Sequence, residues 1–159
     1  MNRIVVGIDG SESSNDALHW AVDQAKLTGA TVEALYAWDP GALVSLGVPP
    51  LVDYAPLREA AEQRPAEIVR EALGDKREVH VVTKMVVGNP AEALVDHSSQ
   101  ADLLVVGSRG LGGLKGMLLG SVGHHCAAHS HCPVVIVHRA PVPEKHHPKR
   151  QTLGGTSAS

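Results

Sequence analysis

The stretch LLVVGSRGLGGLKGMLLGSVG, which spans Leu103–Gly123, decides the fold of this chain. It opens on four consecutive apolar residues, which is typical of a strand covered on both faces of a parallel sheet. Glycines then recur up to Gly123, although each glycine gives up more backbone entropy on folding than any other residue. Something must make that cost tolerable. The tract is therefore a tight turn, a flexible linker or a bare backbone shaped to hold an anion.

The segments around this stretch alternate between strand and helix patterns. Apolar or β-branched runs predict strands, whereas apolar residues at helical spacing, with capping residues at the ends, predict helices. The predicted strands cover residues 4–8, 31–38, 78–87, 103–106 and 133–138. The predicted helices cover residues 10–29, 57–73, 88–99 and 121–130. This order predicts an α/β fold, an open and mainly parallel five-stranded sheet with helices on both faces.

Three segments depart from the simple alternation. Residues 39–56 carry several prolines and glycines without a period, so we expect a long surface loop. Pro65 lies inside the helix predicted at 57–73 and should kink or restart it. Residues 140–159 have lost almost all bulky apolar side chains, which predicts a disordered tail after a single domain at 1–139.

Composition excludes several classes of protein. The chain has 159 residues, enough for one substantial core. Its net charge of -3 and its aromatic content of 3% argue against a nucleic-acid partner, which needs positive charge or stacking platforms. No apolar run approaches the ~20 residues of a membrane helix, and no signal peptide is evident after Met1. We expect a cytoplasmic protein that contacts neither nucleic acid nor membrane.

The glycine tract lies where open α/β sheets bind their ligands, beyond the carboxyl end of a strand. It leads into the helix predicted at 121–130, so the N–H groups of Ser121 and Val122 can face an anion at the positive end of the helix dipole. This favours a phosphate-binding loop. It is not a P-loop, because Lys115 precedes Gly116, and neither GxGxxG nor the GxSxG elbow is present.

The spacing of Gly107, Gly110, Gly120 and Ser121 gives the pattern GxxGx9G[ST]. Together with the opening IVVGIDGSESS, the GNPAEAL helix start, the strand ADLLVVGSRG and the closing CPVVIV, it resembles the ATP-binding branch of the universal stress protein family. The likeness covers nearly the whole chain. It implies the strand order 3-2-1-4-5 of the adenine nucleotide alpha hydrolase-like, Rossmann-type architecture, with ATP between the ends of the first and fourth strands.

The resemblance also implies a set of binding residues. Asp9 ends the first strand, the backbone of Ala37 lies beside the adenine, and the others surround the ribose and phosphates. These others are Gly107, Arg109, Gly110, Gly120, Ser121 and Val122. Physically, Asp9 can accept from ribose hydroxyls or help to hold Mg²⁺, or it can serve as a turn former before the helix. Arg109 or Lys115 can offset phosphate charge, and Gly123 replaces a serine of many relatives, which removes a hydroxyl.

We therefore expect a protein that holds ATP, with Mg²⁺, as a stress-response switch or sensor. The apolar edge strand at 133–138 should pair with its copy in a homodimer. Two alternatives use the same site. One is a slow ATPase or phosphotransferase, for which Asp9 is the only evident general base. The other is binding of a different adenine nucleotide, such as a cyclic one.

The segment HHCAAHSHC, at residues 124–132, invites two further hypotheses. His125 and His129 share a helix face near Cys126 and Cys132, as in a zinc site, but we interpret Cys126 as a small apolar core residue instead. Ser121 and His124 could form a nucleophile pair, yet no carboxylate is placed to orient the base. We assign no catalytic residue, and the metal ligands stay unknown.

Overall fold

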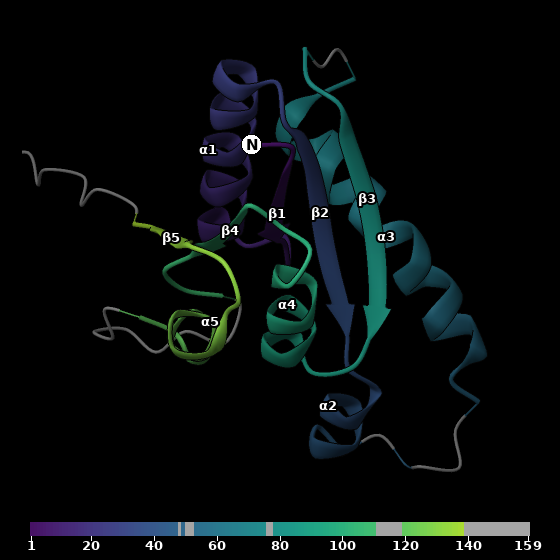
Figure 1. Cartoon of the computed structure of the whole chain (residues 1–159). Coiled ribbons are helices and arrows are strands. Elements are labelled where there is room, and N and C mark those ends of the chain that lie inside the picture. Colours follow the sequence, from purple (N-terminus) through teal and green to yellow (C-terminus); the bar gives the residue numbers. More distant parts are fainter. Residues whose placement is uncertain (48, 50–52, 76–77, 111–118, 139–159) are drawn as a thin grey trace, which may run out of the picture.

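The computed structural model describes residues 1–47, 49, 53–75, 78–110 and 119–138. In these residues five strands and five helices follow one another along the chain (Figure 1). The strands are β1 (Arg3–Gly7), β2 (Thr31–Trp38), β3 (Val81–Val87), β4 (Leu103–Gly107) and β5 (Val134–Val137). The helices are α1 (Glu12–Thr28), α2 (Pro40–Ser45), α3 (Ala55–Leu73), α4 (Pro90–Ser98) and α5 (Ser121–His129).

The five strands form one parallel sheet in the order β3-β2-β1-β4-β5, which confirms the predicted order 3-2-1-4-5. The central strand β1 is almost wholly buried, since Ile4, Val5 and Val6 are 0% exposed. The strand order reverses between β1 and β4, because the chain moves outward to one edge through β2 and β3 and then returns to β4. Such a reversal leaves a crevice at the carboxyl ends of the two strands.

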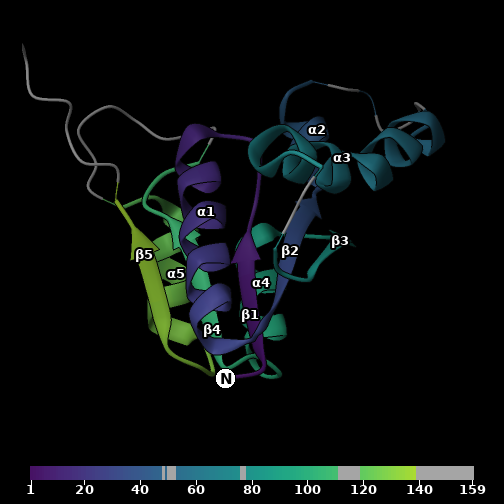
Figure 2. The same cartoon turned by 90° about the horizontal axis from the view of Figure 1, so that it is seen from above.

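Two apolar cores lie on the two faces of the sheet. Alternate residues of β1 point to opposite faces, so Ile4 and Val6 join one core and Val5 the other. Helices α1 and α3 cover the first face, and α4 and α5 cover the second (Figure 2). This burial on both faces explains why the inner strands β1 and β4 are continuous apolar runs rather than alternating ones.

Local signals fix where the helices begin and end. The Ser11 hydroxyl accepts from the Ser14 N–H at the start of α1, and Asn89 accepts from the first amides of α4. Gly29 ends α1 with φ at 72°, a left-handed conformation that favours glycine, and donates its N–H to the Ala25 carbonyl. These caps agree with the helix boundaries expected from the sequence.

Three expectations about the elements were wrong. The segment at 39–56 is not all loop, because α2 occupies Pro40–Ser45. This helix buries no residue and has no apolar period to detect; its signal is Asp39 as N-cap followed by proline. Helix α3 begins two residues earlier than expected, and of the two effects expected at Pro65, a kink or a restart, the restart is wrong because the helix runs through Pro65. Strand β3 begins at Val81 rather than at 78. The predicted tail at 140–159 lies outside the described residues.

A charged network lies at the amino-terminal end of the sheet, under α4. The Arg3 guanidinium donates to Glu33 Oε2 at 2.7 Å, and His97 Nδ1 lies 2.8 Å from Glu33 Oε1. Glu33 is only 9% exposed, so its carboxylate depends on these partners. Burial raises the pKa of Glu33, but the hydrogen bonds from Arg3 and His97 outweigh burial and leave the pKa below its usual range.

We expect Glu33→Gln to lower the free energy of unfolding by about 2 kcal/mol near neutral pH, the cost of a weakened charged hydrogen bond. Because the folded pKa of Glu33 is depressed, this stabilisation is present above the ordinary glutamate pKa of about 4.3 and is lost as pH falls through the lower folded value. Urea unfolding between pH 7 and pH 3 measures this, with the exposed Glu59→Gln as control. A difference in the free energy of unfolding between the parent and Glu33→Gln that is as large at pH 3 as at pH 7 would contradict this prediction.

Candidate functional site

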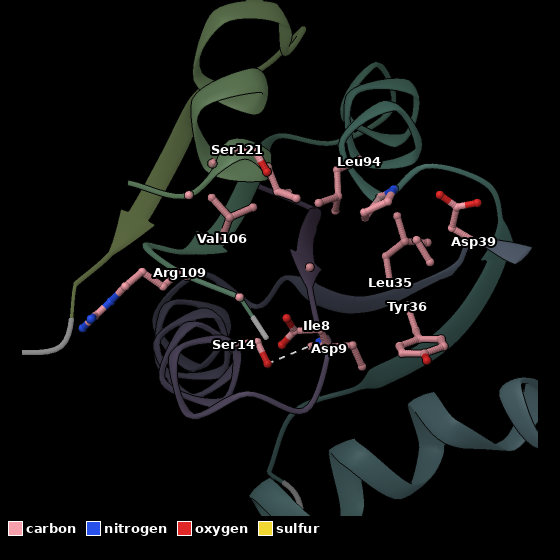
Figure 3. Close-up of a pocket in the computed structure, with 18 of the residues that line it drawn as sticks. Ile8, Asp9, Ser14, Leu35, Tyr36, Asp39, Leu94, Val106, Arg109 and Ser121 are labelled. Atoms are coloured by element: carbon pink, nitrogen blue, oxygen red, sulfur yellow. Dashed lines mark hydrogen bonds between the residues drawn. The ribbon is translucent and has the colours of Figure 1, made fainter. Parts of the chain in front are cut away.

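A cavity of about 710 Å³ opens at the carboxyl ends of β1, β2 and β4 (Figure 3). Its size falls within the roughly 300–1,000 Å³ of small-molecule sites. It lies at the crevice where the strand order reverses, and the first turns of α4 and α5 contribute Pro90, Ser121 and Val122 to its wall. The fold therefore presents one large concave site at the position that open α/β sheets use for ligands.

All the residues that the sequence suggested for nucleotide binding lie on the wall of this cavity. They are Asp9, Ala37, Gly107, Arg109, Gly110, Gly120, Ser121 and Val122. They come from four segments far apart in the chain: the ends of β1 and β2, the segment after β4, and the start of α5. Lys115, the other expected cation, lies outside the described residues.

The two described ends of the glycine tract are held together at the end of β4. The Gly120 N–H donates to the Ser108 carbonyl at 2.8 Å, and the Ser108 N–H donates to the Val137 carbonyl at 2.9 Å. Gly120 precedes α5 and has no side chain with which to cap it. The first N–H groups of a helix have no acceptor within the helix, and Ser121 and Val122 line the cavity, so the positive end of the helix dipole lies at its wall.

The end of β4 packs directly on the first turn of α1. A Cβ at Gly107 would lie only 2.6 Å from the Ser13 carbonyl oxygen, closer than real Cβ contacts come. The Arg109 N–H then donates to Ser13 Oγ at 3.2 Å. Glycine at 107 therefore lets the chain leave the sheet alongside α1 and turn toward the cavity.

Asp9 takes part in the turn between β1 and α1. Its Oδ1 accepts from the Ser11 N–H at 2.9 Å, and its N–H donates to Ser14 Oγ at 3.3 Å. The other carboxylate oxygen faces Gly110, where a Cβ would lie 2.8 Å from Oδ2. The turn-forming role thus coexists with a place for the carboxylate on the cavity wall (Figure 3).

Arg109 contributes to the wall, but its charge is directed elsewhere. Figure 3 shows its side chain extending away from the cavity, on the side of β5, and the residue is exposed. In this conformation the guanidinium does not face the first turn of α5. Arg109 therefore contributes to the cavity wall through its backbone, which follows β4, and not through its charge.

Sequence reasoning missed the apolar wall of the cavity. Tyr36 and Trp38 at the end of β2, Leu43 of α2 and Leu94 of α4 all line it. Leu94 also packs on β1, since a Cβ at Gly7 would lie 2.9 Å from Leu94 Cδ1. Asp39 followed by proline was the available signal for α2, which brings Leu43 to the cavity.

The histidine and cysteine segment lies mainly outside the cavity. Cys126 is 0% exposed in the core under α5, and burial raises the pKa of its thiol to about 11. Burial also raises the pKa of Cys132. In the described part of the chain, no three or more His, Cys, Asp or Glu side chains are grouped so as to hold a metal ion. His124 is exposed and does not line the cavity.

None of the helices in the described ranges is both long enough and apolar enough to cross a membrane.

Comparison with known families and sequences gives one consistent result. The model of the universal stress protein family matches residues 1–138. Universal stress protein Rv2623 of Mycobacterium tuberculosis is 40% identical over 135 residues, which are 84% of this chain but 44% of the relative. Universal stress protein YxiE of Bacillus subtilis is 34% identical over 86% of this chain and 98% of its own length. The chain thus spans less than half of the mycobacterial relative.

Solved structures agree with these sequence matches. A hypothetical protein, MJ0577, superimposes with a TM-score of 0.70 at 27% identity, over 89% of this chain and 98% of its own. A universal stress protein solved in complex with cAMP superimposes with a TM-score of 0.57 at 36% identity, over 86% of this chain and 96% of its own.

Proposed function

Because this chain belongs to the universal stress protein family, we propose that it binds an adenine nucleotide, ATP in the first place, as a stress-response switch or sensor. The observation that carries the proposal is the first turn of α5, which lines a cavity of about 710 Å³ with an apolar far wall. The relative solved with cAMP, 36% identical to this chain, supports an adenine ligand. The family match over 1–138 supports a single domain at 1–139.

The cavity suits the two halves of such a ligand. Its apolar side, with Tyr36, Leu43 and Leu94, would take the flat base beside the backbone of Ala37. At the opposite side, Gly110 and Gly120 leave the backbone bare, and the Ser121 hydroxyl and amide would donate to phosphate oxygens. Gly123 adds no hydroxyl there, so affinity for the phosphates rests on fewer donors.

The chain also offers a place for Mg²⁺ next to the phosphates. Magnesium in nucleotide sites is held by one or two carboxylates together with phosphate oxygens and water. Asp9 supplies a carboxylate on the cavity wall, already oriented by its hydrogen bond from the Ser11 N–H. Asp9 would hold the metal ion or accept from the ribose hydroxyls.

Two alternatives share this cavity. The cAMP complex of the relative favours a cyclic nucleotide, which would use the base-binding side and fewer of the phosphate donors. Slow hydrolysis or phosphoryl transfer would need a general base near the phosphates, and Asp9 is the carboxylate on the wall beside Gly110.

The test is to identify the nucleotide that copurifies with the protein by mass spectrometry, and then to titrate ATP, ADP, AMP and cAMP by calorimetry. We expect ATP in the purified protein and tightest binding of MgATP. Bound ADP, with release of phosphate from added ATP, would favour hydrolysis. Preference for cAMP would favour the cyclic ligand. If no nucleotide copurifies and none binds, the proposal is wrong.

We also propose that two copies pair through β5, which is one edge of the described sheet. The carbonyls of Pro133 and Val137 accept from the N–H groups of Leu104 in β4 and of Ser108 directly after it. Because backbone groups alternate along a strand, those of Val134 and Ile136 point away from β4. An apolar edge of this kind is a natural surface for pairing with a second copy.

We therefore expect Ile136→Pro to convert a dimer into a monomer. Proline removes the N–H of Ile136, which points away from β4, and leaves the hydrogen bonds between β4 and β5 in place. Light scattering after size-exclusion chromatography measures the mass. The matched control is Thr83→Pro in β3, whose amide also points away from the sheet at the opposite edge. A monomeric parent, or loss of the dimer in both variants, would contradict pairing through β5.

A further inference from the structure

A second, smaller hollow of about 320 Å³ adjoins the main cavity, between the first turns of α4 and α5. The two hollows share three wall residues, Pro90, Ser121 and Val122. In Figure 3 the Ser121 side chain lies between the start of α5 and α4. The place proposed for the phosphates is therefore the boundary between the two hollows, and a group attached beyond the phosphates would enter the smaller one.

The chemistry of the smaller hollow differs from that of the main cavity. Four of its wall residues carry polar side chains: Asn89, Glu92, Ser121 and His125. His125 is half-buried, and its ring is packed against that of His129 with the centroids 4.5 Å apart. A carboxylate, an imidazole, an amide and a hydroxyl together can both accept and donate hydrogen bonds.

This set does not suit another phosphate. The first amides of α4 are already used, because Asn89 Oδ1 accepts from the N–H groups of Ala91 and Glu92 at 2.9 and 3.3 Å. The Glu92 carboxylate would also repel an anion. A neutral group with several hydroxyls fits better, since Glu92 can accept from a hydroxyl while His125 and Asn89 bond to others.

We propose that the smaller hollow binds a sugar joined to the nucleotide through its diphosphate, so that adenosine diphosphate sugars such as ADP-ribose form a second ligand class of this site beside ATP. This inference rests on the proposed function, because the main cavity must hold the adenosine diphosphate part. In that arrangement Ser121 lies at the last phosphate, and Glu92 and His125 hold the distal sugar.

The test compares ADP with ADP-ribose by calorimetry on the whole chain. We expect ADP-ribose to bind about tenfold more tightly than ADP, which corresponds to one or two net hydrogen bonds. Ala91→Trp fills the smaller hollow, and Glu92→Gln with His125→Leu removes its carboxylate and its imidazole. Both changes should abolish the advantage and leave ADP affinity unchanged. Ala127→Trp, exposed on α5 outside both hollows, is the matched control and should keep the advantage.

The outcomes separate this inference from the function on which it rests. If ADP binds and ADP-ribose binds no more tightly, the sugar site is wrong and nucleotide binding stands. If the advantage survives in Ala91→Trp, the sugar lies elsewhere and the inference is overturned. If neither compound binds the parent protein, the proposed function fails and the sugar site fails with it.

Discussion

Replacing Gly107 with alanine should lower the free energy of unfolding by about 3 kcal/mol, at the upper end of the cost of overpacking a core. The added Cβ would lie 2.6 Å from the Ser13 carbonyl oxygen and 2.7 Å from its carbonyl carbon. These are backbone atoms in the first turn of α1, so no side-chain rotation can relieve the contact. Either β4 or α1 must shift, and both carry buried core residues.

Thermal unfolding followed by circular dichroism would measure this as a fall in Tm of about 6–12 °C for a chain of this size. Gly120→Ala is the matched control, because its Cβ would lie 3.6 Å from the Ser108 carbonyl oxygen and 3.7 Å from the Arg109 Cα, in ordinary contact. We expect the control to change stability by less than about 1 kcal/mol. Equal stability losses in the two variants would show that the end of β4 does not pack on α1 in this way.

The sequence predicted the sheet well because its inner strands are buried on both faces and its edge strands are rich in β-branched residues. Apolar and β-branched runs predicted β1, β2, β4 and β5 to within a residue or two at each end. Strand β3 begins later than expected because residues 78–80 carry a strand-like sequence but do not pair with β2 as part of the strand. Helix α2 was not predicted because it packs no side chain into the core. A helical period of apolar residues is present in a sequence only where one face of the helix is buried.

Some residues of the candidate site could likewise be predicted from the sequence, and others could not. Gly107, Gly110 and Asp9 could be named before the structure because the glycine spacing and the IVVGIDGSESS opening resemble a known family, whose binding residues the resemblance carries onto these positions. Leu94 and Leu43 are ordinary apolar residues in the sequence, and only the packing of α4 and α2 brings them to the cavity. No sequence pattern indicated that Glu92 and His125, 33 residues apart by number, would line one hollow.

The motif predicts the position of Arg109 but not the direction of its side chain. Its place after β4 follows from the glycine spacing, and its backbone lines the cavity as expected. The side chain, however, is exposed and has several rotatable bonds, so its direction follows from the surroundings and not from the motif. Figure 3 shows it leaving the site, which places phosphate recognition on backbone amides and Ser121 in our proposal.

Gly110→Val should reduce nucleotide affinity by at least about 100-fold, a loss of about 2.7 kcal/mol in binding free energy. A Cβ at this position would lie 2.8 Å from Asp9 Oδ2, and the two methyl groups of valine extend further into the space proposed for the ribose and phosphates. The contact at Gly110 is with the end of a side chain that can rotate, whereas the contact at Gly107 is with backbone atoms. Because Gly110 is also exposed, the fold should persist. Calorimetry with MgATP measures the affinity, and circular dichroism verifies the fold.

Two further variants separate the causes of that loss. Ala127→Val adds the same kind of side chain at an exposed position of α5 outside the cavity and should bind MgATP as the parent does. Asp9→Asn removes the charge of Asp9 and adds no bulk. If the displaced carboxylate explains the whole effect, Asp9→Asn loses as much affinity as Gly110→Val; if valine also fills the space of the ligand, Asp9→Asn loses less. A Gly110→Val protein that is folded and still binds MgATP like the parent would contradict the proposed placement, because the ribose and phosphates would meet the valine beside Asp9.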